Sequence, residues 1–263
     1  MTAWRPSRVR GWLSVRHSLG SEAVAVLTLY GLYELARGLV VGDAEEADRH
    51  AQRLVALERS SHLFLEANVQ HAAQALPGLT SLLGIVYLTL HLAVTAGVLF
   101  WLHQRRPAAF PLARTTLLLA SGLALVGYLA YPTAPPRLAG LGIADTVSNG
   151  HVDLNHGLVS SLYNPYAAVP SMHIGYALIV AASLLRHGRH RLVRALGALY
   201  PPFVLLVIVA TGNHFFFDAA AGALVACLAA TAAALSTRPA ATARVTPLPA
   251  QSNPLPPLEE LAA

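Results

Sequence analysis

Long apolar runs separated by short polar connections make up most of the chain. Six runs approach the roughly 20 residues that a helix needs to cross a bilayer, and they cover residues 21–41, 79–102, 112–131, 170–185, 192–210 and 213–235. The first run is too long for a signal peptide and carries Glu34 and Arg37, so we interpret it as a retained helix. The pattern predicts an all-α protein, a polytopic membrane bundle of six transmembrane helices.

The connection between the first two runs has a different pattern. Residues 43–76 mix charged side chains with apolar ones, which are Leu54, Leu57, Leu63, Phe64 and Leu65. This mixture predicts one or two amphipathic helices. They form either an outer interfacial segment on the membrane or a solvated helical hairpin, and the spacing fits both.

Composition supports a membrane protein. Of the 263 residues, 55% are hydrophobic and only 12% are charged, whereas soluble domains carry about 25% charged residues. So few charges would not cover a water-facing surface. The net charge of +5 comes from arginine, since the chain has no lysine. The arginines form short clusters rather than one basic face, so we expect no nucleic-acid partner.

The positions of the arginines predict the orientation of the helices, because cytoplasmic loops are enriched in arginine. Clusters precede the first run, separate the second from the third and the fourth from the fifth, and follow the sixth. We therefore expect a multi-pass protein of the cell membrane with both termini cytoplasmic. Residues 1–20 form a cytoplasmic arm, residues 21–236 the six-helix domain, and the proline-rich residues 237–263 a disordered cytoplasmic tail.

Two polar clusters stand at predicted outer helix ends. In the first, His214 and Asp218 are four residues apart and would share one helix face. The carboxylate can accept a proton from one imidazole nitrogen, which fixes the tautomer and leaves the other nitrogen as a nucleophile or base. The alternative is an inert pair that holds two helices together.

The second cluster contains Pro170, Ser171 and His173. We expect Pro170 in the first turn of the fourth helix, where free backbone amides and the helix dipole favour an anion. Ser171 would add a hydroxyl donor and His173 a proton donor or acceptor, although Ser171 could also merely cap the helix. Arg137 ends a proline-rich stretch at the outer mouth of the third helix, where it would bind a tetrahedral oxyanion or serve as an interface anchor.

Together these residues suit phosphoryl transfer without a metal or cofactor. His214 would attack phosphorus, Arg137 and the amides would stabilise the equatorial oxygens, and His173 would protonate the leaving oxygen. We expect the two imidazoles to converge on one anion at the extracytoplasmic mouth of the bundle.

At these residues the chain resembles the type-2 phosphatidic acid phosphatase superfamily, and it looks most like the inositolphosphotransferase branch that contains inositol phosphorylceramide synthases. Ser171 and His173 resemble the second motif of the superfamily, and His214 with Asp218 resembles the end of the third. The stretch 134–137 is similar to the first-motif region of that branch. The resemblance implies His214 as nucleophile, Asp218 as its orienting carboxylate and His173 as leaving-group acid.

Two phosphate-binding positions of the superfamily are replaced here. The first-motif lysine is absent, and Ile208 stands where the third motif has an arginine. Arg37, near the outward end of the first helix, is our candidate for a replacement cation, and a local pair with Glu34 is the alternative. Tyr87 and His91 are interpreted as interhelical hydrogen-bonding residues rather than lining of a cavity.

The sequence therefore predicts an integral membrane lipid phosphatase or phosphotransferase that acts on lipid phosphate esters at the outer face. Water as acceptor gives a phosphatase, and a lipid alcohol gives an inositolphosphotransferase. A membrane cytochrome and a non-catalytic transporter or scaffold are the alternatives from other classes. Neither of them explains why two histidines, a serine and a carboxylate gather at one side of the membrane.

Overall fold

The computed structural model describes residues 19–39, 42–148 and 164–236. Their regular structure is helical: α1 (Leu19–Leu39), α2 (Ala44–Ser60), α3 (Glu66–Gln74), α4 (Leu79–Arg105), α5 (Phe110–Ala130), the 3-10 turn η1 (Pro136–Leu138), α7 (Met172–His187), α8 (Arg191–Ala210) and α9 (Phe216–Ser236). The prediction of an all-α protein is confirmed for these residues. Most of the expected N-terminal arm and the whole proline-rich tail lie outside them.

A helix occupies each of the six predicted apolar runs. Four of them, α4, α5, α8 and α9, are long and apolar enough to span a membrane, and α1 with α2 would make a fifth if that bent pair is one broken span. At most 39% of any of the four spans is buried inside the protein. Such extensive exposed apolar surface is not found on soluble monomers, so we conclude that the protein is embedded in a membrane.

The short helix α7 lies at the centre of the bundle. It has only 16 residues, yet it packs against α4, α5, α8 and α9. Its start approaches α9 so closely that a Cβ atom built on Gly222 would lie 2.1 Å from the carbonyl oxygen of Ser171. Glycine at position 222 therefore allows the N-terminus of α7 to contact α9 directly.

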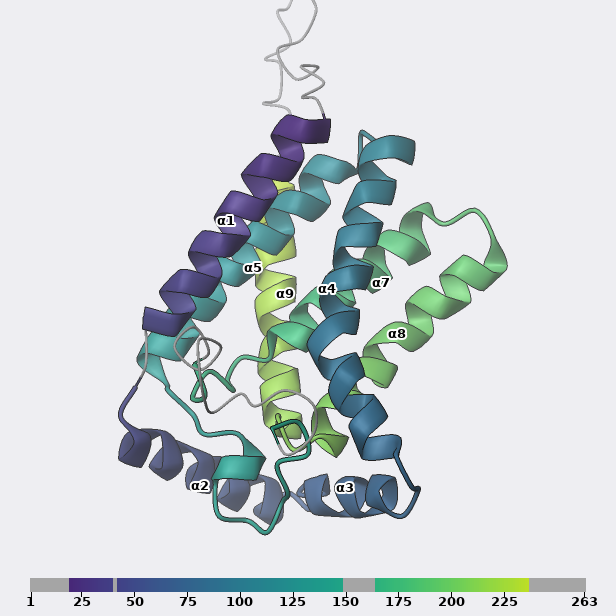
Figure 1. The fold of residues 1–263 in the computed structure, drawn as a ribbon. Coiled ribbons are helices and arrows are strands. Elements are labelled where there is room, and N and C mark those ends of the chain that lie inside the picture. The colour runs from purple at the N-terminus through teal and green to yellow at the C-terminus, as the bar shows by residue number, and fades with distance from the viewer. Residues whose placement is uncertain (1–18, 40–41, 149–163, 237–263) are drawn as a thin grey trace, which may run out of the picture.

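Helices α2 and α3 lie across one end of the bundle (Figure 1). The apolar face of α2 packs against Phe215 before α9, Val169 before α7 and Ala134 after α5. His50 of α2 also hydrogen-bonds the carbonyl of Pro132 at 2.7 Å. From α3, Gln70 bonds both backbone groups of Ala144, at 2.7 and 3.0 Å. The two amphipathic helices thus fix the loops that surround this end of the bundle.

Candidate active site

A polar cavity of about 50 Å³ lies between α1, α4, the start of α7 and the turn before α9. That volume holds roughly four waters, which is comparable to one phosphate group. The polar side chains that line it are Tyr30, Tyr33, Glu34, Arg37, Tyr87, His91, Tyr128, Asn164, His173, Tyr176, Asn213 and His214. Three residues predicted from the sequence, Arg37, His173 and His214, therefore meet at one cavity.

His214 lies in a turn rather than in α9, because the helix begins at Phe216. The prediction that His214 and Asp218 share one helix face is therefore wrong. Gly212 makes the turn with φ +71°, and a Cβ atom there would lie 2.8 Å from Ile143 Cγ2. The N–H group of His214 donates to the carbonyl of Ile208 at 3.2 Å. The turn, not helical periodicity, sets the direction of this imidazole.

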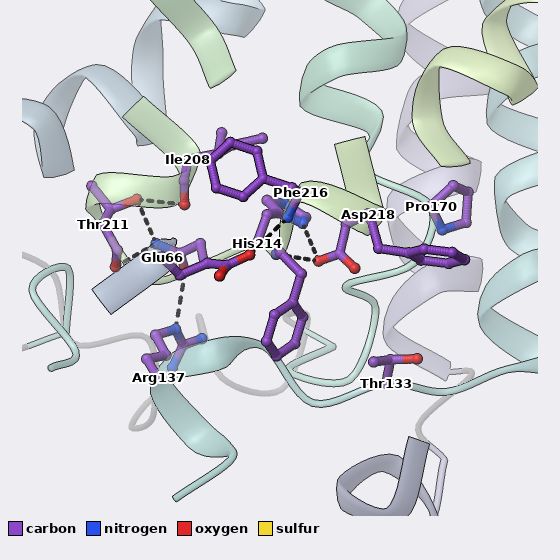
Figure 2. Close-up of polar contacts among 12 residues, drawn as sticks. Glu66, Thr133, Arg137, Pro170, Ile208, Thr211, His214, Phe216 and Asp218 are labelled. Carbon is purple, nitrogen blue, oxygen red and sulfur yellow. Dashed lines mark hydrogen bonds and ion pairs between the residues drawn. The ribbon is translucent and has the colours of Figure 1, made fainter. Parts of the chain in front are cut away.

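The contact between His214 and Asp218 forms nonetheless (Figure 2). His214 Nδ1 lies 3.2 Å from Asp218 Oδ2, and the same oxygen accepts the N–H of Phe215 at 2.8 Å. Asp218 is fully buried and His214 is 5% exposed. Because the carboxylate occupies Nδ1, the imidazole has Nε2 free for chemistry at the cavity.

His173 lies in the first turn of α7, beside His214. The ring centroids of the two imidazoles are 5.4 Å apart. The Tyr87 ring stacks on His173 with its centroid 4.4 Å away, and the centroid of the His91 ring is 4.2 Å away. His173 Nε2 is buried, and no described residue gives it a hydrogen-bond partner. An anion in the cavity would supply that partner.

The N-terminus of α7 adjoins the cavity, although Pro170 does not begin the helix. Ser171 is the N-cap and Met172 the first helical residue, so the predicted position of Pro170 in the first turn is wrong. Ser171 donates its N–H to the carbonyl of Asp218 at 3.0 Å. Its Oγ is buried without a hydrogen-bond partner in the described part of the chain. The unpaired amides of a first helical turn and the dipole of α7 therefore favour an anion here.

Arg137 is not among the residues that line the cavity. Its Nε donates to Asn213 Oδ1 at 3.0 Å and its Nη1 to Asp145 Oδ2 at 2.9 Å. Burial acts to raise the pKa of Asp145, but the N–H of Ser148 and the charge of Arg137 outweigh it and hold that pKa below its ordinary value. Arg137 thus forms an ion pair outside the cavity and contacts the lining through Asn213.

Arg37, in the last turn of α1, forms the local pair with Glu34 that its position in the sequence suggested. Its Nη2 lies 3.3 Å from the carboxylate of Glu34, one turn earlier. Both side chains also line the cavity. A guanidinium is therefore present in the cavity together with the two histidines.

Tyr87 and His91 both line the cavity, which the sequence analysis did not expect. The Nδ1 atom of His91 bonds the carbonyl of Tyr87 at 3.1 Å within α4, and its ring lies 4.2 Å from that of His173. A smaller void of about 10 Å³ is lined by His91, His173 and Ile208 together. The sequence shows that Tyr87 and His91 are four residues apart and share one side of α4. Only the packing of α4 against α7 shows that this side faces the site.

The arrangement provides imidazoles, a guanidinium and a helix N-terminus around one small cavity. No group of three or more histidine, cysteine, aspartate or glutamate side chains in the described ranges is placed to hold a metal ion. The guanidinium and the helix N-terminus can bind an anion, and the imidazoles can supply a nitrogen nucleophile and move a proton. An apolar helical bundle that carries such a site is a membrane protein of the phosphatase type.

The comparison with protein families agrees with this description. The model of the PAP2 superfamily matches residues 52–232, more than half of the chain, so the chain belongs to the PAP2 superfamily. The match supports phosphatase or phosphotransferase activity and covers both polar clusters. No curated protein and no solved structure matches the chain.

Proposed function

We propose that the protein is a metal-independent lipid phosphatase or phosphotransferase that works through a phosphohistidine. The observation that carries the proposal is the pair of imidazoles at one cavity, 5.4 Å apart, with His214 oriented by Asp218. His214 Nε2 attacks phosphorus, and the N–P bond forms as the P–O bond to the leaving group breaks. His173 gives its proton to the departing oxygen. His173 then takes a proton from water or an alcohol, whose oxygen displaces His214.

The phosphate oxygens have several donors in reach of the cavity. Arg37 supplies a guanidinium, and the first turn of α7 supplies amides. Ser171, the N-cap of α7, adds a buried hydroxyl whose Oγ has no hydrogen-bond partner in the described part of the chain. His91 lies beside Ile208, so an imidazole is available where the usual third motif has an arginine. Arg137 supports this set by holding Asn213 rather than by contact with phosphate.

The substrate that fits the setting is an amphiphile with its phosphate at the membrane surface. Phosphatidic acid, a polyprenyl diphosphate and phosphatidylinositol all present such a group. Release of phosphate to water makes the protein a phosphatase, and transfer of phosphoinositol to a lipid alcohol makes it an inositolphosphotransferase. Both share the first half of the reaction.

We further propose six transmembrane helices, with α1 and α7 completing the four spans that are long and apolar enough by themselves. Arginine-rich connections lie on the cytoplasmic side of a membrane. The site lies at the helix ends opposite those connections, so the active site is extracytoplasmic. Helices α2 and α3 lie at the outer interface. Both helices lie across the site end of the bundle (Figure 1), and α2 buries Ala47, Ala51, Leu54 and Val55 there.

The test uses purified protein with the three radiolabelled lipids, each with and without a lipid alcohol. We expect turnover of at least one lipid and an acid-labile phosphoenzyme. His214→Ala abolishes both, and His71→Ala, an exposed histidine of α3, leaves both unchanged. Turnover without a phosphoenzyme, or undiminished turnover by His214→Ala, contradicts the mechanism. No turnover of any lipid phosphate favours a transporter or scaffold.

A further inference from the structure

Three buried carboxylates hold the first turn of α9, which begins two residues after His214. The N–H groups of residues 215, 216 and 217 donate to one carboxylate each. The acceptors are Asp218 Oδ2 at 2.8 Å, Glu66 Oε1 at 3.0 Å and Glu58 Oε1 at 2.7 Å. Figure 2 shows Glu66 bonded to Phe216 beside the His214–Asp218 contact. The helix that carries the orienting aspartate is therefore anchored by two glutamates from outside it.

The two glutamates come together because the chain reverses tightly between α2 and α3. The N–H of Leu63 donates to the carbonyl of Glu58 at 2.7 Å, and His62 adopts the left-handed region at φ +57°. Glu58 near the end of α2 and Glu66 at the start of α3 thus face the same helix end. Glu58 is 3% exposed and Glu66 is fully buried.

Three negative charges at one buried helix end would repel strongly. A helix N-terminus offers only about half a positive charge. The second oxygens of Glu58, Glu66 and Asp218 are buried, and no donor in the described part of the chain bonds them. Burial first, and then the nearness of the Glu66 carboxyl group, raises the pKa of Glu58 to about 8.

Acidic side chains from two other helices face Glu58. Glu66 faces it from α3 and Asp218 from α9, with His214 on the other side of Asp218. Arg59, the neighbour of Glu58 in α2, lies over the ring of Phe64 at 4.9 Å. The electrostatic balance of the cluster therefore favours one proton on the glutamate pair.

We propose that Glu58 and Glu66 share one proton and act as positioning residues for the His214–Asp218 pair. The catalytic part of this inference rests on the proposed function. With the proton present, Glu58 accepts the amide of residue 217 and donates to the free oxygen of Glu66, so two carboxyl groups hold α9 with one charge. Loss of the proton makes the two groups repel, which loosens the first turn of α9 and displaces Asp218.

The pair has a predictable effect on folding. An unfolded chain releases the proton of Glu58 near its ordinary pKa of 4.5, whereas the folded protein holds it to about pH 8. The proton therefore stabilises the fold fully at pH values below 4.5. This stabilisation is lost as the pH rises through about 8. A glutamine at position 58 keeps both hydrogen bonds without a titratable proton.

The experiment measures kcat and KM for lipid phosphate hydrolysis between pH 6 and pH 9.5 in detergent, alongside the melting temperature at each pH. It compares wild type with Glu58→Gln, Glu58→Ala and, as a matched control, Glu45→Gln. Glu45 lies on the same helix with its side chain 87% exposed. The melting temperature needs no substrate, so it tests the shared proton even if no lipid phosphate is hydrolysed.

We expect kcat of wild type and Glu45→Gln to fall about tenfold above pH 8, with KM changed less than about twofold, since a displacement near 1 Å reduces rate rather than binding. Glu58→Gln keeps its activity at pH 7, loses this alkaline fall, and melts at a temperature that depends less on pH. Glu58→Ala loses roughly tenfold in kcat at pH 7.

Two outcomes overturn the proposal. One is an unchanged alkaline fall and an unchanged pH dependence of melting in Glu58→Gln, because the shared proton is then absent. The other is a folded Glu58→Gln protein as inactive as Glu58→Ala. If wild type hydrolyses no lipid phosphate but its melting temperature shows the pH dependence that Glu58→Gln removes, the proposed function fails and the proton-sharing pair stands.

Discussion

A methyl group added at Gly222 tests whether the close contact between α7 and α9 sets the geometry of the site. In Gly222→Ala the new Cβ atom would lie 2.1 Å from the carbonyl oxygen of Ser171 and 3.3 Å from its nitrogen. Restoring an ordinary C···O distance of roughly 3.3 Å requires the two helices to separate by about 1 Å. The atoms met are backbone, so no side-chain rotation relieves the contact.

The magnitude follows from where that backbone lies. Ser171 N-caps α7, and its N–H bonds the carbonyl of Asp218, so separation moves His173 away from His214. A misplacement of about 1 Å in a catalytic group reduces rate by roughly 100-fold. Overpacking reduces the free energy of unfolding by about 1–3 kcal/mol. We expect kcat of Gly222→Ala to fall toward 100-fold while the protein still folds.

The assay is phosphate release from the best lipid substrate, with the melting temperature in detergent as a measure of folding. Gly122→Ala is the matched control, because Gly122 lies within α5 and a Cβ atom there meets no atom within 4 Å. Alanine is favoured over glycine in a helix by about 1 kcal/mol, so this control should be at least as stable as wild type and fully active.

The reasoning is refuted if Gly222→Ala keeps wild-type kcat, because the site would then not depend on contact between Ser171 and α9. It is also refuted if Gly122→Ala loses as much activity, because helix glycines would then matter for flexibility rather than for space. A Gly222→Ala protein that retains the phosphoenzyme but turns over slowly agrees with displacement of His173, which takes the proton of the acceptor in the second half of the proposed reaction.

Four further predictions test the other parts of the site. Asp218→Asn, which disturbs the tautomer of His214, should lower kcat by about 10²–10⁴ with little change in KM; a loss below threefold contradicts the orienting role. Arg37→Ala should reduce kcat/KM by roughly 10–100-fold, as expected for a charged hydrogen bond of about 1.5–3 kcal/mol, and Arg37→Lys should recover part of it; equal losses in both contradict a role for its charge. The depressed pKa of Asp145 contributes stability above its ordinary pKa that is lost as pH falls through the folded value, so Asp145→Asn should flatten the acid side of a melting-temperature profile, and an unchanged profile contradicts the ion pair. In a Cys227→Ser background, a membrane-impermeant maleimide added outside cells should label Arg49→Cys on the exposed face of α2; labelling only after lysis reverses the orientation.

Much of this protein follows from local patterns in the chain. The six helices coincide with apolar runs because a run of apolar residues is itself what makes a helix suitable for lipid. The pairing of His214 with Asp218 also follows from short spacing, since a separation of four residues keeps the two side chains close both in a helix and in the turn that is present. The segments around His173 and His214, which carry the resemblance noted in the sequence, both lie within the matched range 52–232.

Other features depend on contacts between distant segments. α7 is short and moderately apolar, yet it is central, because glycine at position 222 lets it approach α9. Arg137 pairs with Asp145 and Asn213 instead of the cavity, and His91 turns out to be on the cavity side of α4. The residues next to Arg137 do not determine its partners, and those next to His91 do not determine which side of α4 faces the cavity.

The glutamates of α2 and α3 show the same limit most clearly. Within their own segment, Glu58 and Glu66 belong to a charged, amphipathic stretch that predicts surface exposure. They are buried because the start of α9 has free N–H groups that need acceptors, and the reversal at residues 61–65 brings both carboxyl groups to that place. Hydropathy depends on the residue itself, whereas the partner of a buried charge depends on which helix end folds against it.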